Sequence, residues 1–250
     1  MITKEVLQAR WKVLTFALLA LASSVDNIIR FCYTKYLQAC GDPSYPLFQE
    51  LTHDSFMKNY SAFTWHHWFA TDGPLIMVLF AAVLGGGLIA EEARTGPIFP
   101  LPSKPVRRTR LFLVRYAVSA GLLLAVSVLS SLVLALAGLT LRQPLEVQAL
   151  LIATGLLWLV ALVPLGLALF FSILFSDTLR PVVFSLLVMA GLVLLPIVLP
   201  NGGLQGLERY WNEQQAFLMG SFPLMASLIC LVAVLVPLLA ALLVFRRKAY

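Results

Sequence analysis

The sequence predicts an all-α membrane protein with six transmembrane helices, cytoplasmic termini and an interfacial N-terminal helix. Hydrophobic residues make up 60% of its 250 residues and charged residues only 12%, about half the charge of an ordinary soluble domain. The mean hydropathy is +0.89. Apolar segments of about 20 residues, the length that crosses a bilayer as a helix, recur along the chain. A polytopic helical membrane protein is the class that fits these observations.

Residues 1–12 predict a short helix at the membrane surface, since apolar residues recur there at helical spacing opposite charged ones. The charged start of a membrane span is the alternative, and the sequence leaves it open. The first span follows over residues 13–31; a signal peptide with a cleavage site near Ala22 is the competing prediction. Asp26 and Arg30 are one helical turn apart near its outer end, so they can pair. Because intramembrane charge suggests function, we name both as candidates for a polar pathway, with a paired and solvated membrane edge as the alternative.

Residues 32–73 predict a long external loop that folds back over the membrane surface. Its second half is rich in aromatic residues, which favour the water–lipid interface: Tyr60, Phe63, Trp65, Trp68 and Phe69. The loop also holds the three histidines of the chain: His53, His66 and His67. Imidazoles bind copper or zinc well, but interfacial polar residues are the simpler interpretation, and we assign no metal site. Cys32 and Cys40 are either bridged, in an oxidising compartment, or two reduced thiols.

The remaining chain predicts five further spans, at about residues 74–90, 111–139, 147–175, 181–200 and 222–245. Residues 201–221 predict an external amphipathic or re-entrant segment before the last span. No internal repeat is evident, so residues 1–250 are interpreted as a single transmembrane domain.

Positive charge sets the predicted orientation. With the N-terminus inside, 13 of the 18 Lys and Arg residues fall on the inner side, so the positive-inside rule places both termini in the cytoplasm. We predict a multi-pass protein of the cell (plasma or inner) membrane. The formal net charge of +6 follows from this topology, so we expect a lipid bilayer around the chain and no nucleic acid as partner.

Residues 91–110 predict a cytoplasmic segment between the second and third spans, because they are too polar to lie in hydrocarbon. The segment follows three glycines, Gly85 to Gly87, which let helices pack closely. Glu91 and Glu92 open it, prolines stiffen it, and its arginines can pair with acidic groups on a partner. The segment has the form of a docking surface; an ordinary positive-inside loop is the alternative.

The order of residues in this segment is specific. The run Gly87-Leu88-Ile89-Ala90-Glu91-Glu92, the step from Glu92 to Gly96 and the run Ser103-Lys104-Pro105-Val106-Arg107-Arg108 follow one another. In this order they resemble the permease subunits of type-2 ABC transporters, where a Gly-Leu-Ile-x-Glu-like run, a Glu-x-x-x-Gly step and a Ser-Lys/Arg-Pro-apolar step separate two spans. The resemblance covers Gly85 to Arg110, and elsewhere it rests on architecture.

The resemblance implies that this segment contains the coupling helix that fits a cleft in a separate ATPase subunit. The positions carried over are Glu91, Glu92, Gly96, Pro105 and Arg107. It also implies that two permease subunits, a second copy or a homologue, face each other around a translocation path. The coupling helix is expected to be short or irregular here, because the chain departs from the family pattern at Pro97, Pro100 and Pro102.

ATP chemistry is not expected in this chain, which has no Gly-x-x-x-x-Gly-Lys-Ser/Thr loop. The resemblance assigns ATP and magnesium to the partner subunit, so we expect no cofactor, no catalytic residue and no enzymatic activity from the chain itself. We predict the permease subunit of an ATP-driven exporter. The alternative is a stand-alone membrane sensor or assembly factor that binds a ligand or metal through the external aromatic and histidine loop. The sequence identifies neither the substrate, nor the direction of transport, nor whether the two permeases are alike.

Overall fold

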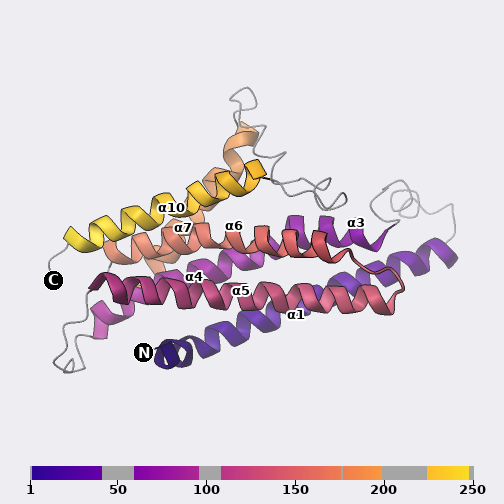
Figure 1. Cartoon of the computed structure of the whole chain (residues 1–250), viewed down its shortest axis with the longest axis horizontal. Helices are drawn as coiled ribbons and strands as arrows, with labels where there is room; N and C mark the ends of the chain where they lie inside the picture. The colour runs from indigo at the N-terminus through magenta and orange to yellow at the C-terminus, as the bar shows by residue number, and fades with distance from the viewer. Residues whose placement is uncertain (1, 41–58, 96–107, 176, 199–223, 248–250) are drawn as a thin grey trace.

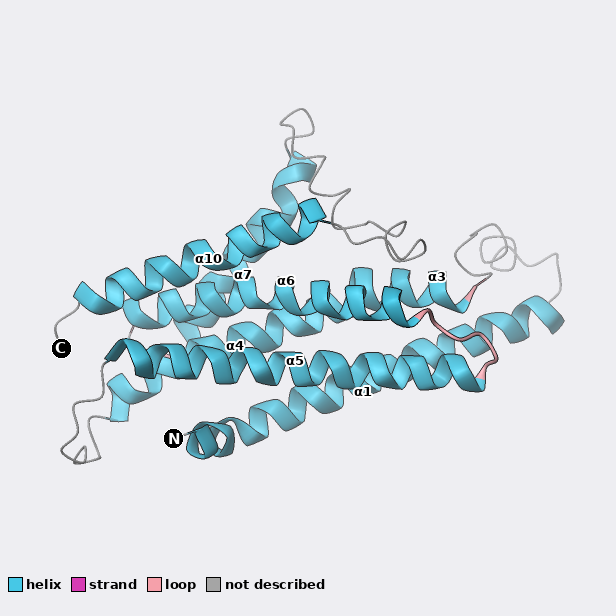
Figure 2. Cartoon of the chain, viewed as in Figure 1, coloured by secondary structure: helices cyan, strands magenta, loops and turns pink. Residues whose placement is uncertain are grey.

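The computed structural model describes residues 2–40, 59–95, 108–175, 177–198 and 224–247. These residues form a bundle of long helices (Figure 1, Figure 2), and none of them forms a strand. The all-α prediction is therefore confirmed for this part of the chain. In chain order the elements are α1 (Ile2–Cys40), α3 (Tyr60–Thr64), the π-helix η2 (Trp65–Asp72), α4 (Gly73–Thr95), α5 (Arg108–Thr140), α6 (Val147–Leu174), α7 (Leu179–Val198) and α10 (Leu224–Arg247).

Several of these helices have the length and composition of membrane spans. Within the described ranges, five stretches qualify: Arg10–Tyr36, Tyr60–Gly87, Phe112–Thr140, Val147–Leu174 and Ser227–Val244. In α7 the apolar stretch Leu179–Leu192 is shorter. The length and composition of the helices are compatible with a multi-pass membrane protein, and a sixth crossing through α7 stays a prediction.

The N-terminal region is one uninterrupted helix, α1. The predicted interfacial residues after Met1 continue directly into the first span, and the helix extends beyond Phe31, where the span was predicted to end. Cys32 and Cys40 therefore lie on the same helix, about 12 Å apart along its axis. A disulfide needs Cα atoms within about 7 Å, so this helix excludes the bridge. Cys32 is a free, exposed thiol.

The second half of the predicted 32–73 loop is helical. α3, η2 and α4 follow one another without a break, so this membrane helix begins at Tyr60 and not at Pro74. Its aromatic residues face the bundle: Tyr60, Phe63 and Trp68 are each 1% exposed. The prediction of a surface loop over this stretch is wrong, because these residues are helical and other helices of the bundle cover their side chains.

Helix α1 is one of the covering helices. Phe31 lies edge-on to the rings of Tyr60 and Phe63, with centroids 5.1 and 5.3 Å apart, an arrangement that adds to the gain from burying the rings. A run of aromatic residues faces the interface only where no neighbouring helix packs against it. Helix α1 extends far enough to pack against this run. Residues 41–58, which include His53, lie outside the described residues.

The π-helix carries this segment through a proline. Gly73-Pro74 predicts a helix start, since proline favours the first helical turn. In the structure the Gly73 amide donates to the Trp68 carbonyl, five residues back. Pro74 has no amide hydrogen to continue an ordinary helical ladder, and the wider turns of η2 end directly before it. The irregular turns of η2 and Pro74 are therefore adjacent in the chain.

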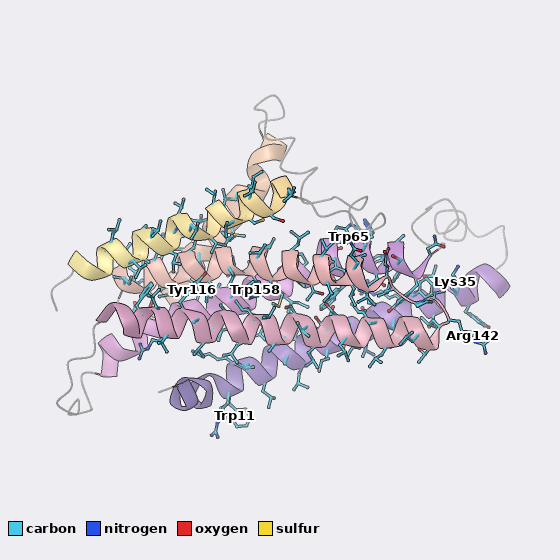
Figure 3. The ribbon with its side chains drawn as sticks, in the orientation of Figure 1. Trp11, Lys35, Trp65, Tyr116, Arg142 and Trp158 are labelled. Carbon is cyan, nitrogen blue, oxygen red and sulfur yellow. The ribbon has the colours of Figure 1, made fainter. Side chains whose placement is uncertain are left out.

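The helices pack around α6, which contacts α4, α5, α7 and α10. The start of α1, the end of α4, the start of α5 and the end of α10 lie at one end of the bundle (Figure 1), which we call the terminal end. The end of α1, the start of α3 and the α5–α6 turn lie at the other (Figure 1), which we call the turn end. Figure 3 places Lys35 and Arg142 at the turn end, and Trp11 toward the other.

The turn end is held together by a junction of α5, the α5–α6 turn and α3. Arg142 has a φ of 56°, and the Gln143 amide donates to the Gly138 carbonyl at 2.9 Å, the pattern of a Schellman helix ending. The Gln143 side-chain oxygen accepts the Tyr60 amide at 3.0 Å. The Tyr60 hydroxyl donates to the Leu134 carbonyl at 3.0 Å. Helix α3 is thereby fixed at its first residue.

Candidate functional site

Three consecutive glycines bring α4 into close contact with other helices near the terminal end. A Cβ added to Gly85 would lie 2.7 Å from the Cβ of Ala168 and 2.9 Å from the carbonyl oxygen of Leu165, both on α6. A Cβ added to Gly86 would lie 2.5 Å from Cγ2 of Val182 on α7. Carbon atoms in contact are ordinarily about 3.5–4.0 Å apart. Neither position accepts a larger residue unless its neighbour moves.

The third glycine faces α1. A Cβ added to Gly87 would lie 2.8 Å from Nζ of Lys12. The Ser172 hydroxyl on α6 donates to the Gly86 carbonyl at 3.2 Å, which requires the two helices to approach closely. We call Gly85, Gly86 and Gly87 the glycine crossing. Within one turn it ties α4 to α6, α7 and α1, and the prediction that these glycines permit close packing is confirmed.

The charged segment starts directly after the glycine crossing. Helix α4 continues to Thr95, so the backbone of Glu91 and Glu92 is helical. These two residues lie about 6–8 Å beyond Gly87 along the helix axis. The first two predicted coupling positions are therefore rigid extensions of the crossing.

The other predicted coupling positions lie outside the described residues: Gly96, Pro105 and Arg107. Helix α5 begins at Arg108. The end of α4 and the start of α5 both lie at the terminal end of the bundle (Figure 1). The segment 96–107 therefore connects two helix ends on the same side as the start of α1.

Asp26 and Arg30, the candidates for a polar pathway, form an ion pair on α1. Arg30 Nε lies 2.6 Å from Asp26 Oδ2, and the two side chains are 60% and 48% exposed, respectively. The pair thus faces away from the helices described here and does not line their interior. It neutralises two charges inside the apolar stretch Arg10–Tyr36. A pathway along this outer face stays a prediction.

A second polar contact joins α1 to η2. The Ser23 hydroxyl donates to Asp72 Oδ2 at 3.4 Å. One turn further along α1, Asn27 is 2% exposed, and its amide nitrogen and oxygen have no hydrogen-bond partner in the described part of the chain. Each buried polar group left unpaired costs about 1–3 kcal/mol. Helix packing alone therefore does not explain an asparagine at position 27, because its buried, unpaired amide lowers the stability of the fold.

Sequence reasoning misses this contact because it assigns Asp72 to the external loop. A signal was present on α1, where Ser23 and Asn27 share one helix face at i,i+4 spacing with Phe31. That Phe31 packs on α3 follows only from the structure. Arg115 is a second residue whose burial the sequence does not predict. It is one of the cations on the predicted inner side, but it is only 7% exposed within α5.

The histidines that the structure describes belong to η2, inside the helical stretch Tyr60–Gly87. Their rings lie 5.2 Å apart at 78° to each other, so His66 and His67 present their nitrogens in different directions. Across the described ranges, no group of three His, Cys, Asp or Glu side chains is placed to hold a metal ion. The arrangement supplies no metal centre from these two residues alone.

Comparison with known proteins adds no family to these observations. No protein-family model matches the chain, and no curated protein or solved structure matches it. The resemblance to ABC permeases therefore rests on residues 85–110 and on the architecture. The glycine crossing and the helix ends around that segment are the structural features that bear on it.

Proposed function

We propose that this chain is the permease subunit of an ATP-driven ABC transporter, an exporter of the cell membrane, and that residues 91–110 dock on a separate ATPase subunit. The observation that carries the proposal is the position of the glycine crossing, directly before that segment. The residues that resemble the family's coupling motif thus leave the bundle at the point where α4 touches three other helices.

Because of this placement, a movement of the segment would be transmitted directly to the helix bundle. Only a glycine hydrogen separates Gly85 from α6 and Gly86 from α7, so side-chain rotation on α4 cannot absorb a movement of that helix. Interiors packed this closely transmit strain. A displacement of the coupling segment by the ATPase would therefore move α4, α6 and α7 together. In a pair of permeases, that movement would rock the path between them.

The helix ends support the same topology. The start of α1, both flanks of the coupling segment and the end of α10 lie together (Figure 1), as a cytoplasmic face with a docking surface requires. The proposed partners are the ATPase, which would bind ATP and magnesium, and a second permease copy or homologue. The proposed path through the membrane would lie between the two permeases.

The alternative function, a sensor or assembly factor that reads a ligand through an external aromatic loop, has less support. Its binding residues would be the aromatic run from Tyr60 to Phe69. Tyr60, Phe63 and Trp68 are each 1% exposed, so they are unavailable to an external ligand. The exposed residues of the predicted loop, such as Tyr33, Tyr36 and His66, lie on helices and not in a loop.

Charge neutralisation in the coupling segment tests the proposal. We would replace Glu92 and Arg107 by Gln and measure how much ABC-type ATPase co-purifies with the chain in mild detergent. Removing one partner of a buried charge pair at an interface costs about 2–5 kcal/mol, so at least about tenfold less ATPase is expected. The spans do not contain these residues, so the melting temperature should not change.

A matched control uses the same two residue types at the turn end. Arg142 and Glu146 are exposed and lie within the α5–α6 turn, so replacing both by Gln should leave the captured ATPase unchanged. Full retention of ATPase by the Glu92 and Arg107 variant would contradict docking at this segment. Equal loss in both variants would show that general charge, and not the segment, holds the partner.

A further inference from the structure

The contact between Ser23 and Asp72 lies near the middle of α1. Lys12 and Lys35 mark the two ends of the apolar part of this helix. Ser23 is about 16 Å along the helix from Lys12 and about 18 Å from Lys35. Because the hydrocarbon core of a bilayer is about 30 Å thick, Asp72 is a carboxylate held near its midplane.

No cation compensates this carboxylate within the described residues. Its one hydrogen bond there is the donation from Ser23, which at 3.4 Å is long. Arg30, the cation nearest to Ser23 on α1, is held at 2.6 Å by Asp26, so that pair is neutral by itself. Ionisable residues inside a membrane usually pair or mark the path of a ligand, and Asp72 has no such pair.

Unpaired polar groups lie beside the carboxylate. Helix α1 runs antiparallel to the continuous segment α3–η2 here, since Ser23 meets Asp72 and Phe31 meets Phe63. Asn27, midway between Ser23 and Phe31, is therefore level with Trp68, one turn before Asp72. Asn27 and Trp68 are 2% and 1% exposed. The amide of Asn27 and Nε1 of Trp68 have no hydrogen-bond partner among the described residues.

The irregular helix places these groups together. Asp72 is the last residue of η2, and π-helical segments inside α-helices occur frequently at functional sites. Binding sites near the midplane of transporters are likewise built where a helix departs from regular geometry. The polar groups here belong to one such segment and to the face of α1 opposite it.

We propose that Asp72, with Ser23 and Asn27, binds the positively charged group of an organic cation between α1 and η2. The carboxylate supplies the charge, and the Asn27 amide supplies a donor and an acceptor at the next turn. An inorganic divalent ion fits poorly, since calcium takes about 6–8 oxygen ligands and, among the described residues, no group of three His, Cys, Asp or Glu side chains is placed to hold a metal ion. Ser23 and Asp72 are both half-buried, so their neighbours do not seal the carboxylate off from a ligand.

Binding of tetraphenylphosphonium tests this site. The chain would be purified alone, without any ATPase, and reconstituted in nanodiscs, where saturable binding of the radiolabelled cation is measured. Asp72→Asn removes the charge but keeps the shape, and the loss of a charge-assisted contact predicts binding at least about tenfold weaker. Asn27→Leu should weaken binding about threefold or more. Because no ATPase is present, the result is independent of the proposed transport function.

Three controls make the outcome specific. Asp72→Glu keeps the charge and should bind within a few-fold of the wild type, which separates loss of charge from misfolding. Asp177→Asn removes a carboxylate from the exposed ion pair with Arg180 and should not change binding. Tetraphenylborate, an anion of the same shape, should not compete. Absence of saturable binding by the wild type, unchanged binding by Asp72→Asn, or equal competition by tetraphenylborate would overturn the proposal.

Discussion

Alanine substitutions at the glycine crossing should destabilise the protein in a graded order. At Gly85 the added Cβ meets two rigid atoms, the Ala168 Cβ at 2.7 Å and the Leu165 carbonyl oxygen at 2.9 Å. Overpacking of this kind costs about 1–3 kcal/mol, and the better helix propensity of alanine returns at most about 1 kcal/mol. Because neither opposing atom can rotate away, we expect Gly85→Ala to lower the free energy of unfolding by about 2 kcal/mol.

The two neighbouring glycines differ from each other. At Gly86 the Cβ meets Cγ2 of Val182 at 2.5 Å and the Thr178 carbonyl oxygen at 3.1 Å. Because a helical valine is held in one χ1 rotamer, a cost of about 2 kcal/mol, as at Gly85, is expected. At Gly87 the Cβ meets Nζ of Lys12, the far end of a long side chain. Gly87→Ala should therefore change stability by less than about 0.5 kcal/mol.

Gly121 supplies the matched control, because a Cβ there meets nothing within 4 Å. Gly121→Ala should leave stability unchanged or raise it by up to about 1 kcal/mol. Unfolding would be followed by circular dichroism in mixed micelles as the fraction of SDS is raised. Wild-type stability in Gly85→Ala, or a loss in Gly87→Ala as large as that in Gly85→Ala, would refute the described packing.

Three further predictions concern the turn end. Arg142 has a φ of 56°, a backbone conformation that costs a non-glycine residue about 1–2 kcal/mol, so Arg142→Gly should raise stability by about 1 kcal/mol in the same SDS titration; a loss would contradict the left-handed turn. Tyr60→Phe removes the hydroxyl that donates to Leu134 at 3.0 Å and should cost about 1 kcal/mol, and no change would refute that bond. Cys32 and Cys40 lie on one helix, so a reductant should not increase the number of thiols that an alkylating reagent modifies; a gain of two would show a bridge and a broken helix.

The sequence predicts some boundaries closely and others poorly, for physical reasons. The fourth span, predicted at 147–175, is observed as Val147–Leu174, because Pro144 precedes it and a polar turn follows. The second span is mispredicted by fourteen residues, from Pro74 back to Tyr60. Aromatic side chains suit an interface and a buried helix contact equally well, and only the neighbouring helices, α1 and α5 in the case of Tyr60, decide between them.

The same distinction applies to the candidate sites. Three adjacent glycines predict a close helix contact, but they do not predict which helices pack there, because glycine has no side chain whose chemistry would indicate its partner. Asp72 beside Gly73-Pro74 has the composition of a turn, and its role as a midplane carboxylate depends on the antiparallel register of α1 and η2. Asp26 and Arg30 form their predicted pair at 2.6 Å, because that contact needs only one helix.

The central claim is that an ABC-type ATPase docks on this chain at its terminal end. The most direct measurement is purification of the unmodified chain from its native membrane in mild detergent, with quantitative mass spectrometry of the proteins that accompany it. The account predicts an ATPase of the ATP-binding-cassette class in stoichiometric amount, together with a second permease copy or homologue. Recovery of the chain alone, or with partners that contain no such ATPase, would contradict it.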